Sequence, residues 1–544
     1  MALSPYLPSL PSARPKGSSA AWKNYPATAV LTVGASRLGH AARVAHRENF
    51  MNKRATLAVA AVVAATLAAA DKPLGTLDSA IEALGANRIT SIEYSGSGKW
   101  YQFGQEPSPT LPPPEFDVSS YIATIDYVAA AKRVQMASRQ TVDPARLRFP
   151  PREARADEYV AGDVAWIVGR PGGPATGLPV TNVPDAKNVE ERAMEIWATP
   201  HGFLRAAAAN HATSAPTTDG GTEVTFMAGK HKYVGKINAQ NEVQKIYTWI
   251  ANPVVGDALC QAAFTGYRDF GGVLFPSRIV RTLGGKLRLV LTVSSVKANP
   301  NAGIPVPDGM RAAMSAPVPV TADKLADGVY WIKGGQWHSV AIEQADHIVV
   351  VDAPLDEARS LAVIAKVKAT IPKKPIKYLI NTHAHFDHAG GLRTYVDEGS
   401  TIVTMPMNQA FYERAWREPR TLSPDRLAQS RKTPKFEPII NGKGVLSDGR
   451  RTIEIHEQTG TAHNDAIVMI YLPKEKILIQ VDAWNTEAVT APYLDTIGGD
   501  FVNPYMVNLY ENILRLKLDV GQIVPLHGPR TATVAELRKA LLLD

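Results

Sequence analysis

The chain has 544 residues, 45% of them hydrophobic and 20% charged, so it is long enough for two or more domains with sizeable cores. Its formal net charge is +8, but residues 1–54 carry eight basic and one acidic side chain, a net +7 that leaves +1 for residues 55–544. Because residues 55–544 are nearly neutral, their charge does not favour binding to DNA or RNA, and we expect no nucleic-acid partner. The single cysteine, Cys260, excludes an intramolecular disulfide framework, and we expect it to be a small buried hydrophobe.

Residues 51–70 have the pattern of a secretory signal peptide. The segment begins with Met, Asn and two basic residues and continues as an alanine-rich apolar run, shorter than the roughly 20 residues of a membrane span. We therefore expect cleavage after Ala70 and a periplasmic or secreted mature protein; the alternative is a retained N-terminal anchor. Residues 1–50 are rich in Pro, Ser and Ala without periodicity, and we expect them to be disordered or a spurious upstream extension.

Residues 71–298 predict an antiparallel, β-rich domain, because several segments alternate apolar and polar residues and are separated by short turns. These segments are 91–101, 222–226, 232–237, 243–249 and 287–293. The pattern loosely resembles the curved half-barrel of periplasmic lipoprotein carriers, which implies contact with a lipid or acyl chain. Aromatic residues such as Phe264 and Phe275 would then either line an apolar groove or fill the core.

Residues 299–320 contain five prolines and little periodicity, and they predict a linker. Residues 321–544 alternate β-type runs with segments of helical spacing. The predicted helices are 355–371, 505–518 and 533–543. Residues 407–441 are basic and contain a tryptophan. They form either a helical cap over a cleft, with Tyr412 and Trp416 facing substrate, or a solvated helical pair.

The most informative motif follows the apolar run 378–380. His383, His385, Asp387 and His388 lie within six residues of one another. Imidazoles and carboxylates suit zinc or a similar transition ion. Four such side chains in so short a loop cannot all reach one ion comfortably, so we expect two adjacent ions.

Three further candidate ligands come later in the chain. His463, Asp482 and His527 are each preceded by an apolar, β-type run and followed by a turn. We expect all three at strand ends, where loops build sites. Asp352 also ends such a run, and we expect it to shape the loop beside the site without binding metal.

With these residues in this order, the part of the chain from about 325 to 544 resembles the metallo-β-lactamase superfamily. The resemblance implies an αββα sandwich with its site at one edge, so that the whole chain is α+β, with the mostly antiparallel β domain in front and the metallo-β-lactamase fold at 321–544. It implies about two Zn²⁺ per chain, with iron and manganese as open alternatives. The implied ligands are His383, His385 and His463 for the first ion, Asp387, His388 and His527 for the second, and Asp482 as the bridge.

The resemblance also implies chemistry. A metal-bridging hydroxide would attack an ester, thioester, lactone or amide bond of a small-molecule substrate, and Asp387 would orient that hydroxide and then carry its proton. The loop 383–391 is similar to that of acyl-homoserine-lactone lactonases, but Ala483 stands where those enzymes carry a tyrosine. Asp482 stands where zinc β-lactamases carry Cys or Ser. His463 is followed by Asn464 and Asp465, which departs from the family's usual His-Thr-x-Gly.

Three alternatives stay open at this point: a β-lactamase, a metal-dependent phosphodiesterase, and a periplasmic lipid- or lipoprotein-binding protein with an accessory metal domain. The substrate and the oligomeric state are not encoded in these motifs.

Overall fold

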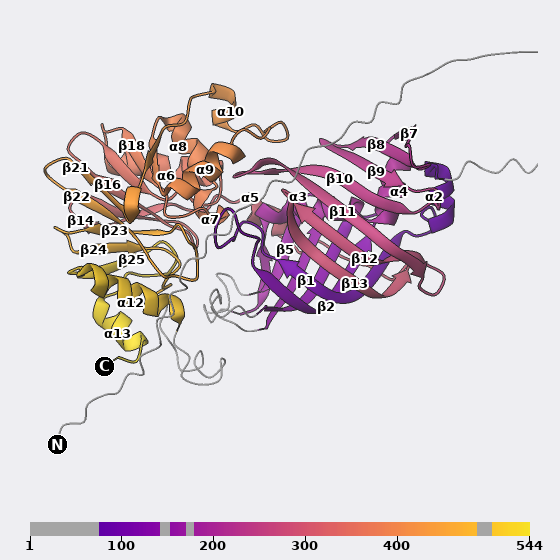
Figure 1. Cartoon of the computed structure of the whole chain (residues 1–544), viewed down its shortest axis with the longest axis horizontal. Coiled ribbons are helices and arrows are strands. Elements are labelled where there is room, and N and C mark those ends of the chain that lie inside the picture. Colours follow the sequence, from indigo (N-terminus) through magenta and orange to yellow (C-terminus); the bar gives the residue numbers. More distant parts are fainter. Residues whose placement is uncertain (1–74, 142–152, 170–178, 487–502, 544) are drawn as a thin grey trace, which may run out of the picture. The chain divides into compact units, whose positions relative to one another are not determined.

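The computed structural model describes residues 75–141, 153–169, 179–486 and 503–543 (Figure 1). The expected signal peptide at 51–70 and the expected extension at 1–50 lie outside these residues and stay predictions. Within the described ranges, no helix is long and apolar enough to cross a membrane. The described chain forms one sheet of 13 strands, followed by a pair of sheets of seven and five strands.

The large sheet is antiparallel throughout, as the alternating segments predict. Its order is β6-β5-β4-β3-β2-β1-β13-β12-β11-β10-β9-β8-β7, so its first strand in sequence pairs with its last. Ile92 of β1 faces Ala298 of β13. The strands are β1 (Ser91–Tyr101), β2 (Glu115–Asp126), β3 (Ala131–Gln140), β4 (Ala154–Ala161), β5 (Val164–Gly169), β6 (Thr181–Pro184), β7 (Thr213–Pro216), β8 (Thr222–Ala228), β9 (His231–Ile237), β10 (Val243–Asn252), β11 (Gly256–Asp269), β12 (Leu274–Leu283) and β13 (Lys286–Ala298).

Helices fill the concave face of this sheet. They are α2 (Leu77–Leu84), α3 (Val189–Trp197) and α4 (Pro200–Ala209), with the 3₁₀ turn η2 (Ala186–Asn188) before α3. Helix α3 contacts β3 and β4 and also β10, strands that stand far apart in the sheet order, so the sheet curves around it (Figure 1). Phe264, Phe275 and Cys260 are all buried in the resulting core. The aromatic pair therefore fills the core, and Cys260 is the buried hydrophobe that the sequence predicts.

Part of the predicted linker is helical. Helix α5 (Met310–Ser315) lies within residues 299–320, and Met310 is buried in a small cluster with Val164 and Trp166 of β5. This proline-rich stretch is thus anchored to the large sheet by an apolar contact.

The rest of the chain has four layers, as three apolar clusters show. One cluster lies between the two smaller sheets, a second lies under α6 and α8, and a third lies under α12 and α13. The αββα sandwich is therefore confirmed. The seven-stranded sheet holds β14 (Thr321–Ala326), β15 (Val329–Lys333), β16 (Ser339–Glu343), β17 (Ile348–Val351), β18 (Ile376–Ile380), β19 (Thr401–Thr404) and β20 (Phe436–Pro438). The five-stranded sheet holds β21 (Lys443–Ser447), β22 (Thr452–Glu457), β23 (Val468–Leu472), β24 (Ile477–Gln480) and β25 (Gln522–Pro525).

The helices of this region include the three that the sequence predicts, with slightly shorter bounds. They are α6 (Glu357–Thr370), α7 (Phe386–Ala389), α8 (Leu392–Glu398), α9 (Pro406–Ala415), α10 (Arg426–Ser430), η3 (Ile440–Gly442), α12 (Pro504–Leu516) and α13 (Val534–Ala540). Asp356 caps α6 by accepting from the Arg359 amide, and Thr533 forms a capping box on α13.

Of the two alternatives for residues 407–441, the helical cap with Tyr412 and Trp416 facing substrate is wrong. This stretch forms α9, α10 and the edge strand β20, which completes the seven-stranded sheet. Tyr412 is fully buried, and its hydroxyl donates to Asn381 Oδ1 at 2.8 Å instead of facing substrate. Trp416 packs its ring against Tyr412, with 5.5 Å between centroids. Both aromatic side chains therefore serve the core beneath α9.

The loop after α9 makes a second kind of contact, with the turn between β10 and β11. The Arg420 guanidinium donates to the carbonyl oxygens of Asn252, Pro253 and Val254, the last at 2.8 Å. The carboxylate of Asp257 accepts from both the amide and the hydroxyl of Thr421 at 2.7 Å. These bonds tie one end of the large sheet to the seven-stranded region.

Candidate metal centre

Strand ends bring the candidate ligands together. The loop with His383, His385 and His388 follows β18, Asp482 follows β24, and His527 follows β25. Strands β17 and β18 are parallel, as are β24 and β25, so the loops after each pair open at the same edge. His463 comes from the loop between β22 and β23.

All seven predicted residues meet at this edge, in two groups whose ligand atoms lie within 4.8 Å of one another. The first group is His383, His385, His463 and Asp482, and the second is Asp387, His388 and His527. The histidines and Asp387 are divided as in the two ligand sets that the resemblance implies, and Asp482, the implied bridge, falls in the first group.

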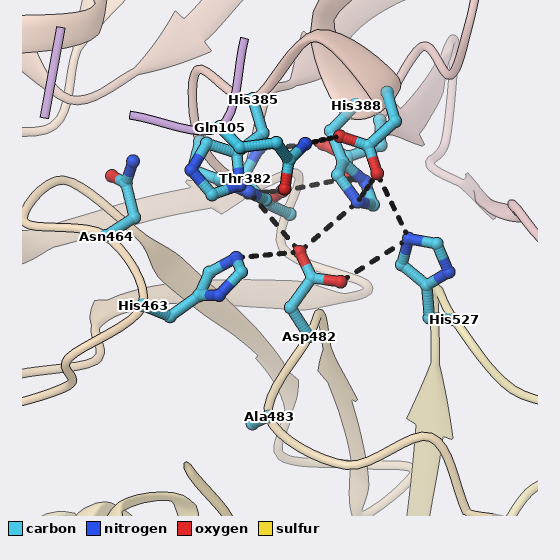
Figure 2. A network of polar contacts seen from close by, with 12 residues as sticks. Gln105, Thr382, His385, His388, His463, Asn464, Asp482, Ala483 and His527 are labelled. Carbon is cyan, nitrogen blue, oxygen red and sulfur yellow. Dashed lines mark hydrogen bonds and ion pairs between the residues drawn. The ribbon is translucent and has the colours of Figure 1, made fainter. Parts of the chain in front are cut away.

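Asp482 lies between the two groups (Figure 2). Its Oδ2 is 3.1 Å from His463 Nε2 and 3.3 Å from both His383 Nε2 and His388 Nε2. Its Oδ1 is 3.4 Å from His527 Nε2. One carboxylate thus faces imidazoles of both groups, which is the position a bridging ligand requires.

Asp352 supports the second group from below. Its Oδ2 accepts from His388 Nδ1 at 2.9 Å and from the Thr382 hydroxyl at 2.7 Å, while its Oδ1 accepts from the Thr382 amide. This contact turns Nε2 of His388 toward Asp482. It is the supporting role that the sequence predicts for Asp352.

The backbone is strained at the same place. Asp352 has φ 59° and Asp482 has φ 58°, in the left-handed region that non-glycine residues adopt infrequently. Aspartate tolerates this conformation better than most residues, and such strain gathers at functional sites.

Burial and neighbouring charges set the pKa values of the site. Burial opposes ionisation of Asp387 and Asp482, but His388 and His527 outweigh it and hold the pKa of both carboxyls well below its usual range. Burial lowers the pKa of His383 well below its ordinary value, and the neighbouring His385 adds to this. For His388, burial is outweighed by Asp482 and Asp387, which raise its pKa. A cation bound here would compete with the proton that the raised pKa of His388 favours.

The donor set fits two divalent transition ions. It offers five imidazoles and two carboxylates, and the imidazole nitrogens Nε2 of His383 and Nε2 of His388 are buried without a well-aligned hydrogen bond. Neutral imidazole and carboxylate are ligands of zinc, and also of iron and manganese.

A family profile described as "Metallo-beta-lactamase superfamily" matches residues 332–481, which include five of these seven residues and end just before Asp482. This part of the chain belongs to the metallo-β-lactamase superfamily.

Curated relatives match parts of the chain. A linear primary-alkylsulfatase of Pseudomonas sp is 33% identical over 76 residues, 14% of this chain and 11% of that protein. A metallo-beta-lactamase type 2 of Bacillus cereus is 22% identical over 197 residues, 35% of this chain and 66% of that protein. A 2,4-dinitroanisole O-demethylase subunit alpha of Nocardioides sp. (strain JS1661) is 23% identical over 181 residues, 31% of this chain and 50% of that protein. Each match spans less than two-thirds of the relative's length.

Two solved structures are similar to part of the chain. A metallo-beta-lactamase from Pontibacter korlensis has a TM-score of 0.31 and 19% identity, covering 41% of this chain and 98% of its own. The metallo-beta-lactamase FIM-1 from Pseudomonas aeruginosa has a TM-score of 0.30 and 20% identity, covering 42% of this chain and 95% of its own.

The metallo-β-lactamase motifs do not identify every residue that contacts the site. Trp337, in the turn between β15 and β16, donates from Nε1 to Asp387 Oδ2 at 3.0 Å. Gln105, in the loop between β1 and β2, donates from Nε2 to Asp387 Oδ1 at 2.6 Å. Both residues are far from Asp387 in sequence, and neither lies in a recognisable motif. The sequence alone therefore does not predict these two contacts.

Proposed function

We propose that this protein is a secreted, metal-dependent hydrolase that holds two zinc ions and cleaves an ester, thioester, lactone or amide bond of a small molecule. The observation that carries the proposal is the place of Asp482, whose two oxygens face imidazoles of both ligand groups. His383, His385 and His463 would hold one ion, and Asp387, His388 and His527 the other. The signal-peptide pattern at 51–70 supports secretion.

Two zinc ions bound here would supply Lewis acidity toward the scissile group and a hydroxide nucleophile at neutral pH. Asp387 supplies the proton-transfer group. Its carboxyl pKa lies well below the usual range because His388 and His527 outweigh its burial, so it is ionised at neutral pH and both oxygens are hydrogen-bond acceptors. Trp337 and Gln105 each donate to one of its oxygens, which fixes the plane of the carboxylate.

The side chains around Asp482 favour some substrates over others. Asp482 stands where zinc β-lactamases carry Cys or Ser, which counts against β-lactams. Ala483 is buried and apolar where acyl-homoserine-lactone lactonases carry a tyrosine, which counts against that lactone class. The match to an alkylsulfatase adds primary alkyl sulfates to the esters worth testing.

Lipid binding by the large sheet is the weaker candidate. A cavity of about 70 Å³ lies beside α3, lined by residues that include Trp100, Glu195 and Arg281. Small-molecule sites enclose about 300–1,000 Å³, so an acyl chain would need the curved sheet to open.

Metal analysis with turnover tests the proposal. Residues 71–544 should contain about two zinc ions per chain, and a panel of esters, thioesters, lactones, amides, phosphodiesters, β-lactams and alkyl sulfates should reveal turnover that chelation abolishes and zinc restores. One iron per chain would redirect the search to redox chemistry. A chain without metal and with co-purified lipid would favour the binding protein.

A further inference from the structure

The loop between β1 and β2 reaches the metal centre from the other structural region. Residues 102–114 connect the two strands, and the close view of the site shows Gln105 beside His385 (Figure 2). Its Nε2 donates to Asp387 Oδ1 at 2.6 Å, a short bond to an ionised acceptor. The two residues are 282 positions apart in sequence.

The next residue of the loop contacts a second ligand. The main-chain oxygen of Glu106 lies 2.9 Å from His385 Nε2 and 3.1 Å from the Asn464 side-chain amide nitrogen. A carbonyl oxygen only accepts, so the hydrogen of the His385 ring is on Nε2, and Nδ1 is the nitrogen directed to the rest of its group. The loop therefore selects which His385 nitrogen can bind metal.

Main-chain bonds seat this loop firmly. The Phe386 amide donates to Gly104 O at 3.0 Å, and the Asp465 amide donates to Pro107 O at 2.7 Å. Gly104 has φ +82°, and a Cβ there would lie 2.8 Å from ring carbons of Phe386. Only glycine allows the loop to approach the metal-binding segment this closely.

The receiving residues also depart from the family pattern. Asn464 and Asp465 follow His463 in place of the usual Thr-x-Gly, and these two residues bond to the loop at Glu106 and Pro107. The residues that depart from the family pattern are thus the ones that bond to the loop, which indicates that the loop is an integral part of this site.

The geometry points to Gln105 as a positioning residue of the metal centre, with the loop of Gly104 to Pro107 as its support. Its amide holds Asp387 Oδ1, so that Oδ2 faces His527 Nε2 at 3.5 Å and His388 Nε2 at 3.7 Å. The inference rests on the proposed function in that the cluster binds metal. It adds that the large sheet contributes to metal affinity and to the proton-transfer geometry.

Replacing Gln105 by alanine tests this role. Contacts of this kind typically change metal affinity or activity by about 10–100-fold, and we expect such a loss of affinity for the second ion, with the first ion retained. The measurement is a zinc titration against a chromophoric chelator. The absorption bands of the cobalt-loaded protein report the second site's geometry without any substrate.

Gln105→Glu separates the hydrogen bond from shape. It has nearly the same shape as glutamine but places a carboxylate against Asp387, so it should weaken the second site more than alanine does. Gln135→Ala is the matched control, because Gln135 is exposed on β3, and it should bind both ions as wild type does.

The outcomes distinguish a failure of the proposed function from a failure of the positioning role of Gln105. Wild-type protein that binds no metal overturns the proposed function. Wild-type protein that binds two ions, with both Gln105 variants showing unchanged affinity and unchanged cobalt bands, overturns the positioning role alone. A second-site loss in the order glutamate, then alanine, with Gln135→Ala unaffected, supports it.

Discussion

Two of the buried polar clusters in the described part of the chain compensate for the cost of burying charge in different ways. In the large sheet, Lys132 pairs with Glu195, and Arg281 Nη1 lies 2.9 Å from the other oxygen of that carboxylate. Burial opposes the charge of Glu195, but Arg281 and Lys132 outweigh it and lower its pKa to about 2. At the sandwich edge, three imidazole nitrogens lie within 3.3 Å of the single oxygen Asp482 Oδ2.

Each charged group of the first cluster faces an opposite charge, whereas in the second cluster the imidazoles outnumber the carboxylates. One carboxylate oxygen cannot accept well-aligned hydrogen bonds from three imidazoles and also neutralise them if they are charged. A cation among the nitrogens satisfies all of them at once. Buried charges that pair indicate a structural network, and buried lone pairs that converge indicate a binding site.

The largest expected effect comes from removing one imidazole of the second cluster. His385→Ala should lose metal and turnover together, by about 10⁴-fold in kcat/KM, because the Lewis acid supplies several kcal/mol of transition-state stabilisation. Zinc content and turnover measure it. His456→Ala is the control, since His456 pairs with Glu454 away from the site, and it should keep both. Full metal content in His385→Ala would contradict the contrast between a self-paired cluster in the large sheet and a metal-binding cluster at the sandwich edge.

Asp387→Ala should affect chemistry more than binding. We expect much of the metal to remain while turnover falls about 10³-fold, the usual contribution of a positioned proton-transfer group. Asp346→Ala, at an exposed site in the same region, should behave as wild type. Near-wild-type turnover of Asp387→Ala would show that the proton moves through another group.

Breaking the self-paired cluster should cost stability and leave the metal centre intact. Glu195→Ala leaves Lys132 and Arg281 buried without their shared partner, a loss of about 3–5 kcal/mol in the free energy of unfolding. Urea unfolding measures it. Lys297→Ala breaks a largely exposed pair with Glu93 in the same sheet and should cost under about 1 kcal/mol. Zinc loss in Glu195→Ala would mean that the two clusters are not independent.

The smallest expected effect is a pH dependence of the free energy of unfolding. One buried histidine in each region contributes to it. Burial lowers the pKa of both His201 and His338 to about 4. The unfolded chain then binds more protons between about pH 4 and 6.5, so the stability that each neutral ring contributes is complete above about pH 6.5 and is lost as the pH falls.

His201→Gln removes this dependence from the large sheet. Between about pH 7 and 4.5 the wild-type sheet should lose about 2 kcal/mol from His201 alone, and the variant should lose that much less. Urea unfolding at the two pH values gives the difference. Equal slopes for variant and wild type would show that His201 is not held neutral by the fold.

The sequence identifies the seven residues of the centre because their signals are local. Four lie in one short loop, and Asp482 and His527 follow β24 and β25, so strand order brings these six to one edge. The strand end expected at His463 is wrong, because this residue lies within the loop between β22 and β23. The alternation in the large sheet likewise predicts antiparallel strands. The pairing of β1 with β13 follows no local signal, because it joins residues about 200 positions apart.

The sequence does not predict contacts between segments that are far apart along the chain. Gln105 lies in a proline-rich loop, and Trp337 lies in a turn, so neither carries a pattern that marks a site. The cap hypothesis failed for a related reason. The helical spacing around Tyr412 is real, but burial of its ring and its bond to Asn381 are decided by tertiary packing.

The place of the loop at the end of β1 has a mechanical consequence. β1 is 11 residues long, so its loop lies about 36 Å from the point where the strand begins. Over that length, a tilt of β1 by about 2° moves the loop at its end by about 1 Å. Functional sites need their residues placed to within about 0.5 Å. The hydrogen bonds of Arg420 and Thr421 to the β10–β11 turn oppose such a tilt. The stiffness of these contacts, which none of the candidate metal ligands makes, therefore affects how precisely Gln105 is held against Asp387.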